Sequence, residues 1–296
     1  ADDTSTLRGL VLKDPAVLHL ENDTSLADNL RQYFVYTSED DKFLPTFVLL
    51  TLRLIRGKCL LFVNDIDRCF RLKLFLEQFG LRTCVLNEEL PANSRFHIVE
   101  EFNKGKYDYI IATDANAGAD VTGKNSKEYG ISRGIDFVNV ACVINFDLPT
   151  SVHTYTHRVG RTARANNTGT ALSFVVPHDQ FGKKKVVSCP TCRHDEEVWD
   201  HIVRNQQESG AVAASGILPW RYDRQQVEAF RYRMEDALRS VTKATIKEAR
   251  IQEVKNEILN SKALKAHFEA NPRDLEYLRH DRALHPVSYT HLTLPT

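Results

Sequence analysis

The chain has 296 residues, 42% of them hydrophobic, which suits one or two globular domains with a sizeable core. Its 39 basic residues balance 39 acidic ones, so net charge indicates no nucleic-acid partner, and any RNA contact must come from a local basic surface. No apolar run approaches the ~20 residues that span a membrane, and the first residues lack the features of a secretory signal. Because the chain opens without Met, we expect it to be a piece of a longer protein.

Short β-rich runs alternate with amphipathic stretches over the first two thirds of the chain. The expected strands are Gln32–Tyr36, Lys58–Val63, Arg82–Leu86, Tyr109–Ala112, Ala141–Phe146 and Thr170–Val175. The expected helices between them are Lys42–Ile55, Asp67–Phe79 and Pro91–Asn103. This alternation predicts βαβ units, and hence a doubly wound α/β fold with a parallel sheet covered on both faces.

Local signals mark the ends of these helices. Asn64 and Asp65 close one strand and can cap the helix that follows, while Pro91 stands at an early helical position. Gly80 is placed to end the second helix in the left-handed conformation.

After Pro177 the pattern changes. Residues Gly182–Gly216 are polar without a sustained period, which predicts a connecting segment. From Asp223 to about Phe268 the apolar spacing predicts one or more helices. The stretch from Arg221 to Lys265 holds 11 basic and 7 acidic residues, and we favour a solvated helix face over an RNA-tracking face. The last ten residues, 287–296, fit neither pattern and are interpreted as a foreign tail.

The segment Tyr155–Arg164 reads Tyr-Thr-His-Arg-Val-Gly-Arg-Thr-Ala-Arg. Its arginines 158, 161 and 164 would lie on one side of a helix, one turn apart. Guanidinium groups suit the charge of a transferring phosphoryl group. On the spacing alone, a surface arginine face making ordinary salt bridges is the favoured interpretation.

The whole string, however, resembles motif VI of the DEAD-box RNA helicases, His-Arg-x-Gly-Arg-Thr-x-Arg. Further motifs of this family follow in the family's order: Cys59–Asn64 resembles motif IV, Ile110–Asp114 and Ser132–Asp136 resemble the halves of motif V, and Ile144–Pro149 resembles the strand and turn before motif VI. The resemblance implies the RecA-like C-terminal lobe of such a helicase, a doubly wound parallel sheet with a mostly helical C-terminal extension.

The resemblance also implies a nucleotide site. Arg161 and Arg164 correspond to the arginine fingers that reach the γ-phosphate across the cleft between two lobes. His157 and Arg158 correspond to positions that link this site to lobe 1. Asp136 corresponds to a carboxylate near the ribose, although it could instead pair with a nearby arginine, and Gly134 belongs to the same motif.

An RNA site is implied in the same way. Thr113 and Gly134 match positions whose hydroxyl or backbone amide meets RNA phosphates, Arg95 matches the arginine of motif IVa, and Asn64 ends motif IV. Contacts of this kind carry no base sequence, so binding should be sequence-tolerant. For Thr113, capping of the following loop stays an alternative.

Two departures from the family pattern stand out. Ala92 occupies a motif IVa position that is usually Gln. Eighteen residues, 115–132, separate Asp114 from Arg133 where the common motif has three, an insertion of 15 residues. This split motif, Ala163 and the sequence of the extension resemble the nucleolar DEAD-box helicases of large-ribosomal-subunit assembly. That likeness implies rRNA processing, pre-ribosomal particles and pre-rRNA as partners, and the nucleus and nucleolus as location.

The chain contains neither a Walker A sequence nor Asp-Glu-Ala-Asp, which in this family belong to lobe 1. We therefore expect ATP as the nucleotide, Mg²⁺ held by lobe 1, and no activity from this chain alone. The expected domains are the end of lobe 1 and a linker (1–31), the RecA-like domain (32–181), a polar linker (182–219), the helical extension (220–286) and the tail (287–296). The alternatives are a stand-alone RNA- or protein-binding module and a related DNA helicase.

Cys189 and Cys192 form a lone C-x-x-C pair, with His194 and His201 downstream. Zinc requires four ligands, and this spacing fits no standard pattern, so a solvent-exposed turn is favoured over a metal site. We interpret the six cysteines as reduced thiols, four of them within apolar runs.

Overall fold

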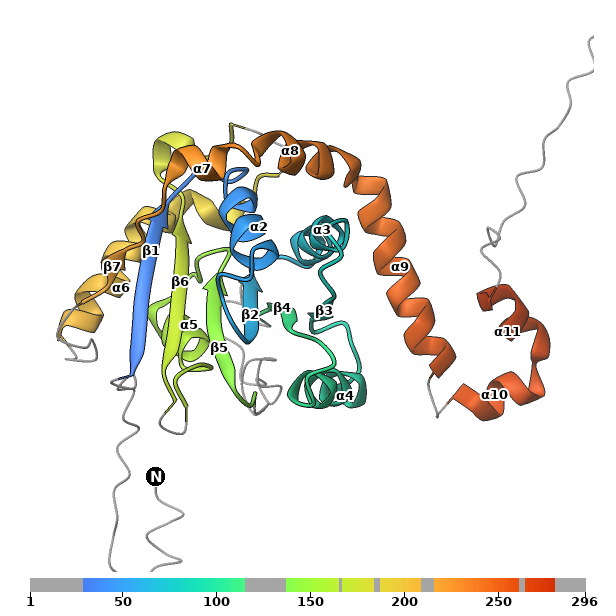
Figure 1. Ribbon diagram of the computed structural model, residues 1–296. Coiled ribbons are helices and arrows are strands. Elements are labelled where there is room, and N and C mark those ends of the chain that lie inside the picture. Colours follow the sequence, from blue (N-terminus) through green and yellow to red (C-terminus); the bar gives the residue numbers. More distant parts are fainter. Residues whose placement is uncertain are drawn as a thin grey trace, which may run out of the picture.

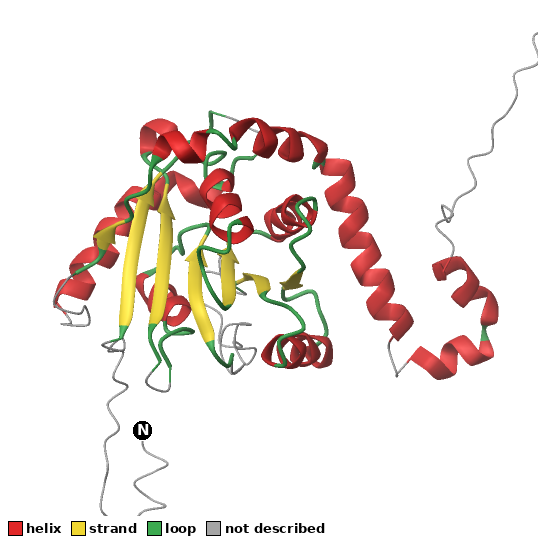
Figure 2. Cartoon of the chain, in the orientation of Figure 1, coloured by secondary structure: helices red, strands yellow, loops and turns green. Residues whose placement is uncertain are grey.

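The computed structural model describes residues 29–114, 137–164, 167–183, 187–208, 216–260 and 264–279. Within them, parallel strands form one sheet in the order β3-β4-β2-β5-β6-β1-β7 (Figures 1 and 2). The strands are β1 (Leu30–Tyr36), β2 (Lys58–Val63), β3 (Thr83–Leu86), β4 (Tyr109–Thr113), β5 (Val140–Asn145), β6 (Gly169–Val175) and β7 (Leu218–Pro219). The predicted α/β class and parallel sheet are confirmed, and the six predicted strands differ from the observed ones by at most two residues at either end.

Helices cover both faces of the sheet, because successive residues of a strand point to opposite sides. In β2, Cys59, Leu61 and Val63 pack on one face while Leu60 and Phe62 pack on the other. The first face carries α2 (Phe43–Thr51), α3 (Ile66–Glu77), α7 (Arg224–Glu228) and α8 (Arg231–Ser240). The second carries α4 (Ala92–Asn103), α5 (Val152–Val159) and α6 (Asp195–Glu208).

The helix-end signals behave largely as expected. The Asp65 carboxylate accepts a hydrogen bond from the Arg68 amide at 3.3 Å and caps α3. Gly80 follows this helix with φ at +73°, the left-handed conformation that glycine adopts without strain. Pro91 stands at the N-cap of α4, one position before the helix that it was expected to open.

The polar segment after Gly182 is more ordered than its sequence indicates. It contains a 3₁₀ turn (Pro190–His194) and then the 14-residue helix α6. Trp199 and Ile202 of α6 are buried against Leu148 and Tyr155. The prediction of a connecting segment without periodic structure is therefore wrong for this helix. The apolar pattern of α6 is short and lies between charged residues, so it carries little periodic signal.

The C-terminal extension divides into several helices. After α7 and α8, the long helix α9 (Lys243–Asn260) lies along α3, and α10 (Lys265–Ala270) and α11 (Pro272–Arg279) lie farther from the sheet (Figure 1). Met234, Val241 and Ile246 join the same apolar cluster as α2 and α3. The extension thus completes the core of the lobe.

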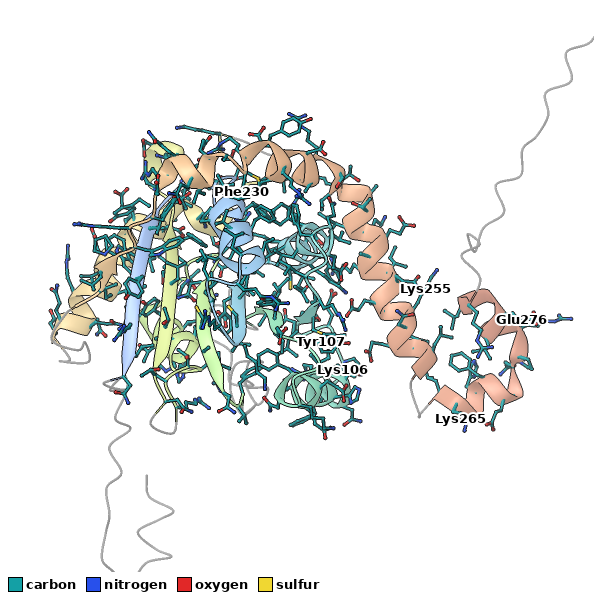
Figure 3. The ribbon with its side chains drawn as sticks, in the orientation of Figure 1. Lys106, Tyr107, Phe230, Lys255, Lys265 and Glu276 are labelled. Carbon is teal, nitrogen blue, oxygen red and sulfur yellow. The ribbon has the colours of Figure 1, made fainter. Side chains whose placement is uncertain are left out.

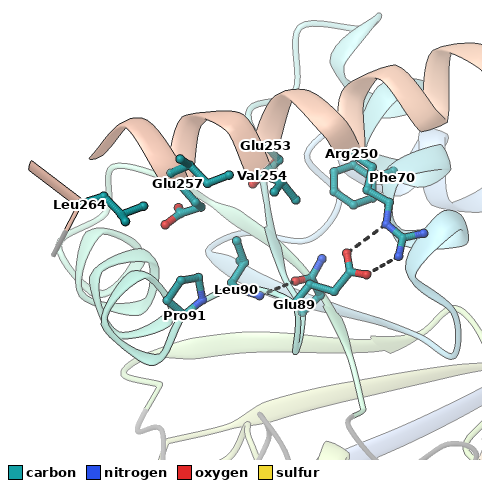
Figure 4. Close-up of a pocket in the computed structure, with 11 residues that line it drawn as sticks. Phe70, Glu89, Leu90, Pro91, Arg250, Glu253, Val254, Glu257 and Leu264 are labelled. Carbon is teal, nitrogen blue, oxygen red and sulfur yellow. Dashed lines mark hydrogen bonds and ion pairs between the residues drawn. The ribbon is translucent and has the colours of Figure 1, made fainter. Parts of the chain in front are cut away.

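An ion-paired clamp holds α9 over the turn that follows β3. Arg250 binds the Glu89 carboxylate through two nitrogens, as Figure 4 shows, and its third nitrogen lies 3.1 Å from Asp67 on α3. Phe70, Leu90 and Val254 line an apolar pocket of about 300 Å³ beside this clamp.

Five of the six cysteines are buried, Cys84 is half-buried, and all six are free thiols. In the part of the chain that the structure describes, no helix combines the length and apolarity needed to cross a membrane. Residues 1–28, the motif V insertion and the tail at 287–296 lie outside the described residues.

Candidate functional site

Polar residues gather where three neighbouring strands end. Asn64 follows β2, Asp114 follows β4, and Asp147 lies two residues beyond β5. Because the strands are parallel, their carboxyl ends meet at one edge of the sheet, which is where open α/β sheets place their ligand sites.

Arg158 from α5 joins these three strand ends. Its Nε lies 2.5 Å from the Asp114 carboxylate, its Nη1 donates to the Asp147 carbonyl at 2.6 Å, and its Nη2 donates to Asn64 Oδ1 at 2.7 Å. The guanidinium also stacks over the Phe62 ring, with 5.1 Å from Cζ to the centroid. Arg158 is fully buried, so its charge is compensated entirely within the lobe by Asp114 and by these acceptors.

The Asp147 carboxylate faces away from Arg158 into a second buried cluster. Arg68 Nε lies 2.6 Å from one of its oxygens and Lys42 Nζ lies 3.3 Å from the other. Burial alone would raise the pKa of Asp147, but the two cations outweigh it and hold that pKa below its usual value. The turn after β5 is thus held by three cations: Lys42 at the N-cap of α2, Arg68 on α3 and Arg158 on α5.

Helix α5 ends before two of its three predicted arginines. The Ser151 side chain caps its start by accepting the Thr154 amide at 3.2 Å, and its last residue is Val159. Arg161 and Arg164 therefore lie in the loop beyond the helix, and the three arginines do not share one helical face. Arg161 is almost buried, whereas Arg164 is exposed and its Nε donates to the Gly160 carbonyl at 2.7 Å.

The loop that carries these arginines packs tightly on β6. Ala163 adopts φ of +57°, rare for a residue with a side chain. A Cβ at Gly169 would come within 2.5 Å of the Ala163 amide nitrogen and of Thr162 Oγ1. Glycine at the start of β6 is therefore required for the loop to lie where it does. The loop is also held by Thr162, which donates to the Val140 carbonyl at 2.5 Å.

The predicted RNA-contact residues lie along the same edge. Thr113 ends β4, and Arg95 is in the first turns of α4. Thr113 Oγ1 and Arg95 Nε are buried atoms without a hydrogen-bond partner among the described residues. The amide nitrogen of the Asn64 side chain donates to the Leu148 carbonyl at 2.7 Å and to Thr191 at 2.9 Å, so Asn64 is firmly positioned. The RNA contacts of these residues stay predictions.

His157 lies on α5, where its ring nitrogen is 3.0 Å from that of His153. Asp136 and Gly134, predicted to contact the nucleotide, fall outside the described residues. The structure adds Asp114 and Asp147 as residues that position the site. The sequence signal for both is their place inside family motifs directly after strands, but nothing in it indicates which arginine each would bind.

The cysteine pair lies beside this cluster and not in an exposed turn. Cys189 and Cys192 are both buried, and Cys192 Sγ is 3.5 Å from Lys42 Nζ. The Cys189 amide donates to Glu39 at 2.7 Å, and this bond helps to hold the turn with Cys189 and Cys192 beside the buried ion pairs of Asp147. The exposed-turn interpretation is therefore wrong. The described residues include no group of three or more His, Cys, Asp or Glu side chains arranged for a metal ion.

Comparisons with known proteins agree with this geometry. Residues 42–166 match the helicase conserved C-terminal domain. The chain therefore carries a helicase conserved C-terminal domain with a RecA-like fold, as its resemblance to the DEAD-box helicases predicts.

Its relatives bear a common name. The chain is 50% identical to the ATP-dependent RNA helicase DBP9 of Debaryomyces hansenii, over 98% of this chain and 54% of that protein. It is 49% identical to the protein of the same name from Candida albicans, over 97% of this chain and 54% of that protein. The chain spans about half the length of these curated relatives.

Among solved structures, the chain is similar to S. cerevisiae Dbp5 bound to RNA and ADP BeF3. The TM-score is 0.51 and the identity 23%, over 80% of this chain and 53% of that chain. At this identity the likeness shows the fold, which is the one predicted.

Proposed function

We propose that this chain is the second lobe of an ATP-dependent RNA helicase whose RNA-stimulated ATP hydrolysis requires a preceding lobe. The observation that carries the proposal is the Arg158 network. It ties helix α5 to the carboxyl ends of three strands, directly before the loop that holds Arg161 and the exposed Arg164. The names of the relatives support the same activity.

The nucleotide side of the proposal rests on the two loop arginines. Arg161 and Arg164 would contact the γ-phosphate of ATP, whose spread negative charge suits forked guanidinium donors. Asp136 would lie near the ribose. His157 would link the site to the preceding lobe, and the buried Arg158 would act indirectly, by holding α5 and the following loop in place.

Magnesium does not fit the carboxylates of this edge. Asp114 is paired with Arg158, and Asp147 is paired with Arg68 and Lys42, so their charges are already compensated by cations. We therefore propose that Mg²⁺ is held by the preceding lobe.

The RNA side of the proposal uses phosphate contacts. Asn64, Thr113 and Arg95 lie at the carboxyl edge of β2, β4 and β3, and Gly134 belongs to the same motif as Thr113. Backbone contacts of this kind tolerate any base sequence. Closure of the two lobes on ATP would bend one RNA strand and separate a short duplex locally.

For the cellular role we propose rRNA processing within pre-ribosomal particles in the nucleolus. The support is the likeness of the split motif V and of the extension to nucleolar helicases of large-subunit assembly. Cosedimentation of the longer protein with pre-60S particles, together with nucleolar fluorescence of a tagged copy, tests this role. A uniformly cytoplasmic protein that sediments free of such particles would contradict it.

The activity is tested by substituting the exposed arginine in the longer protein. Arg164→Ala should lower RNA-stimulated ATP hydrolysis by about 10³-fold or more while weak RNA binding persists. Arg239→Ala is the matched control, because Arg239 is exposed on α8. ATP hydrolysis within about tenfold of the unmodified rate in the Arg164→Ala variant would exclude the assigned role.

A further inference from the structure

A pocket of about 480 Å³ lies between α3, the turn before Cys189 and the first two turns of α9. The pocket belongs neither to the predicted nucleotide site nor to the predicted RNA site. One of its walls is Asp65, which directly follows Asn64, a predicted RNA-contact residue. The extension therefore builds a recess next to the surface where RNA phosphates are expected.

The lining of this pocket is strongly basic. It contains two carboxylates, Asp65 and Asp67, and five basic side chains, an excess of three positive charges: Arg68, Arg71, Lys243, Lys247 and Arg250. The α9 members are spaced by four and three residues, which places them on one face of the helix.

Two of the five cations are already paired. Arg68 binds the buried Asp147, and Arg250 binds Glu89 and Asp67. The Asp65 carboxylate accepts a hydrogen bond from the Arg68 amide and caps α3. Of the two lining carboxylates, Asp67 is therefore paired with Arg250 and Asp65 accepts a backbone amide, and neither forms an ion pair with the other three cations.

Arg71, Lys243 and Lys247 have no ion-pair partner among the described residues. Arg71 is only 7% exposed, and its guanidinium donates to the Val241 carbonyl at 3.4 Å. Burial and the charge of Arg68 lower the pKa of Arg71 and outweigh the opposing charge of Asp67, which forms its ion pair with Arg250. A buried guanidinium without an ion pair of its own is unusual, because desolvation of an unpaired charge is costly.

We propose that this pocket is a phosphate-binding site formed jointly by the helicase lobe and its extension. Arg71 would supply a forked donor at the base of the pocket, and Lys243 and Lys247 would supply point charges at its mouth. The side chains of Val187, Pro190 and Ile246 complete the wall.

The position of the pocket favours a phosphate of single-stranded RNA that continues past Asn64, and this choice of source rests on the proposed function. A free polyphosphate compound has the same chemistry and is the other source.

The experiment uses the full chain with two probes: a fluorescently labelled 12-nucleotide oligo(U), followed by anisotropy, and inorganic pyrophosphate, followed by ³¹P NMR line broadening. The test variant is Lys243→Glu/Lys247→Glu, with Lys243→Gln/Lys247→Gln as a milder second variant. Both lysines are exposed on α9. The matched control is Arg239→Glu/Lys265→Glu, which reverses the same number of charges at two exposed residues, on α8 and α10, that do not line the pocket. Figure 3 shows Lys265 on α10, beyond the end of α9.

With RNA as the source, the test variant should bind oligo(U) about tenfold more weakly, and the slope of log affinity against log salt should fall by about 0.7 for each phosphate that the variant no longer binds. The control should bind as the unmodified chain does. Loss of pyrophosphate binding alone would support the site with a free polyphosphate as its ligand.

Equal binding of both probes by test variant and control would overturn the proposal, as would a failure of the unmodified chain to bind either probe. These outcomes are independent of ATP hydrolysis in the longer protein. Failure of the phosphate site therefore remains distinguishable from failure of the proposed helicase activity.

Discussion

Arg158 shows how a residue expected at a nucleotide site also holds the lobe together. Its guanidinium makes charge-assisted contacts with three strand ends, and no part of it reaches solvent. Arg158→Ala would leave the buried Asp114 carboxylate without its partner, and should lower the free energy of unfolding by about 3–5 kcal/mol. Urea denaturation measures the effect.

Arg164→Ala, at an exposed position of the same motif, is the control for stability and should change the free energy of unfolding by less than about 0.5 kcal/mol. An Arg158→Ala variant as stable as this control would refute the account of the buried network.

Asp195 predicts a pH dependence of stability. Burial raises its pKa to about 7, since Lys42, 3.9 Å away, shares its charge with the nearer Asp147. The pKa of this carboxyl in the unfolded chain is near 4. Between about pH 4 and pH 7 the folded state therefore holds a proton that the unfolded state has lost, so this group makes the free energy of unfolding fall as pH rises. A tenfold difference in proton affinity between the folded and unfolded states corresponds to about 1.4 kcal/mol.

Asp195→Asn removes this titration while the amide oxygen can still accept the Val176 amide. The variant should therefore gain stability relative to the unmodified chain on going from pH 5 to pH 8. Unfolding by urea at both values measures the difference, and a difference that does not change with pH would contradict the prediction.

Single residues are predictable where a motif fixes the chemistry, and not where the partner comes from a distant segment. The motifs that contain Asn64, Thr113 and Arg158 are enough to predict that the site lies at the carboxyl ends of their strands. The contacts of Arg158 with Asp114 and Asp147 depend on how three strands align, which the sequence does not state. Burial of the cysteine pair likewise depends on Glu39 and Lys42, about 150 residues away.

At the scale of elements, the loop between α5 and β6 depends on one glycine. Gly169→Ala would force the new Cβ against Thr162 Oγ1 and the Ala163 amide nitrogen. The Ala163 nitrogen is a backbone atom and cannot rotate away as a side chain could. We expect a loss of about 1–3 kcal/mol in unfolding free energy, as for other overpacked sites. We also expect lower ATP hydrolysis in the longer protein, because the loop carries Arg161 and Arg164. Unchanged stability together with unchanged hydrolysis would argue against tight packing here.

Helix α9 belongs to the core at its first turns and to the surface farther on. Ile246 is 3% exposed in the main apolar cluster, whereas Ile251 is 46% exposed. Ile246→Ala should cost about 2–4 kcal/mol of unfolding free energy, and Ile251→Ala about 0.5 kcal/mol or less. Thermal or urea unfolding of this pair tests whether the extension is part of the lobe. Equal small effects would indicate an extension that is only loosely attached.

The elements that the sequence predicts well are those with strong local signals. The strands read as continuous apolar runs because both faces of a parallel sheet are buried, and the predicted bounds of β2 match the observed ones. The two-residue strand β7 has no such run and is not predicted. Helix α6 is not predicted because its buried face consists of few residues, notably Trp199 and Ile202, within a charged stretch. Tertiary packing, not local pattern, defines both.

In the whole molecule, the functional residues lie at two levels of the sheet. The polar strand ends and the basic pocket of α3 and α9 lie toward the carboxyl ends of the strands, whereas the loop with Arg161 and Arg164 packs beside the starts of β5 and β6. We propose that a preceding lobe would face both regions and complete the site. We therefore propose that ATP hydrolysis requires both lobes, with Arg161 and Arg164 acting across the cleft between them.

The most direct measurement is RNA-stimulated ATP hydrolysis by this chain alone and by the chain joined to its preceding lobe. We expect no hydrolysis by the chain alone and RNA-dependent hydrolysis once the lobe is restored. Hydrolysis by the chain alone, or none from the joined protein, would contradict it, and the second result would favour an RNA- or protein-binding module.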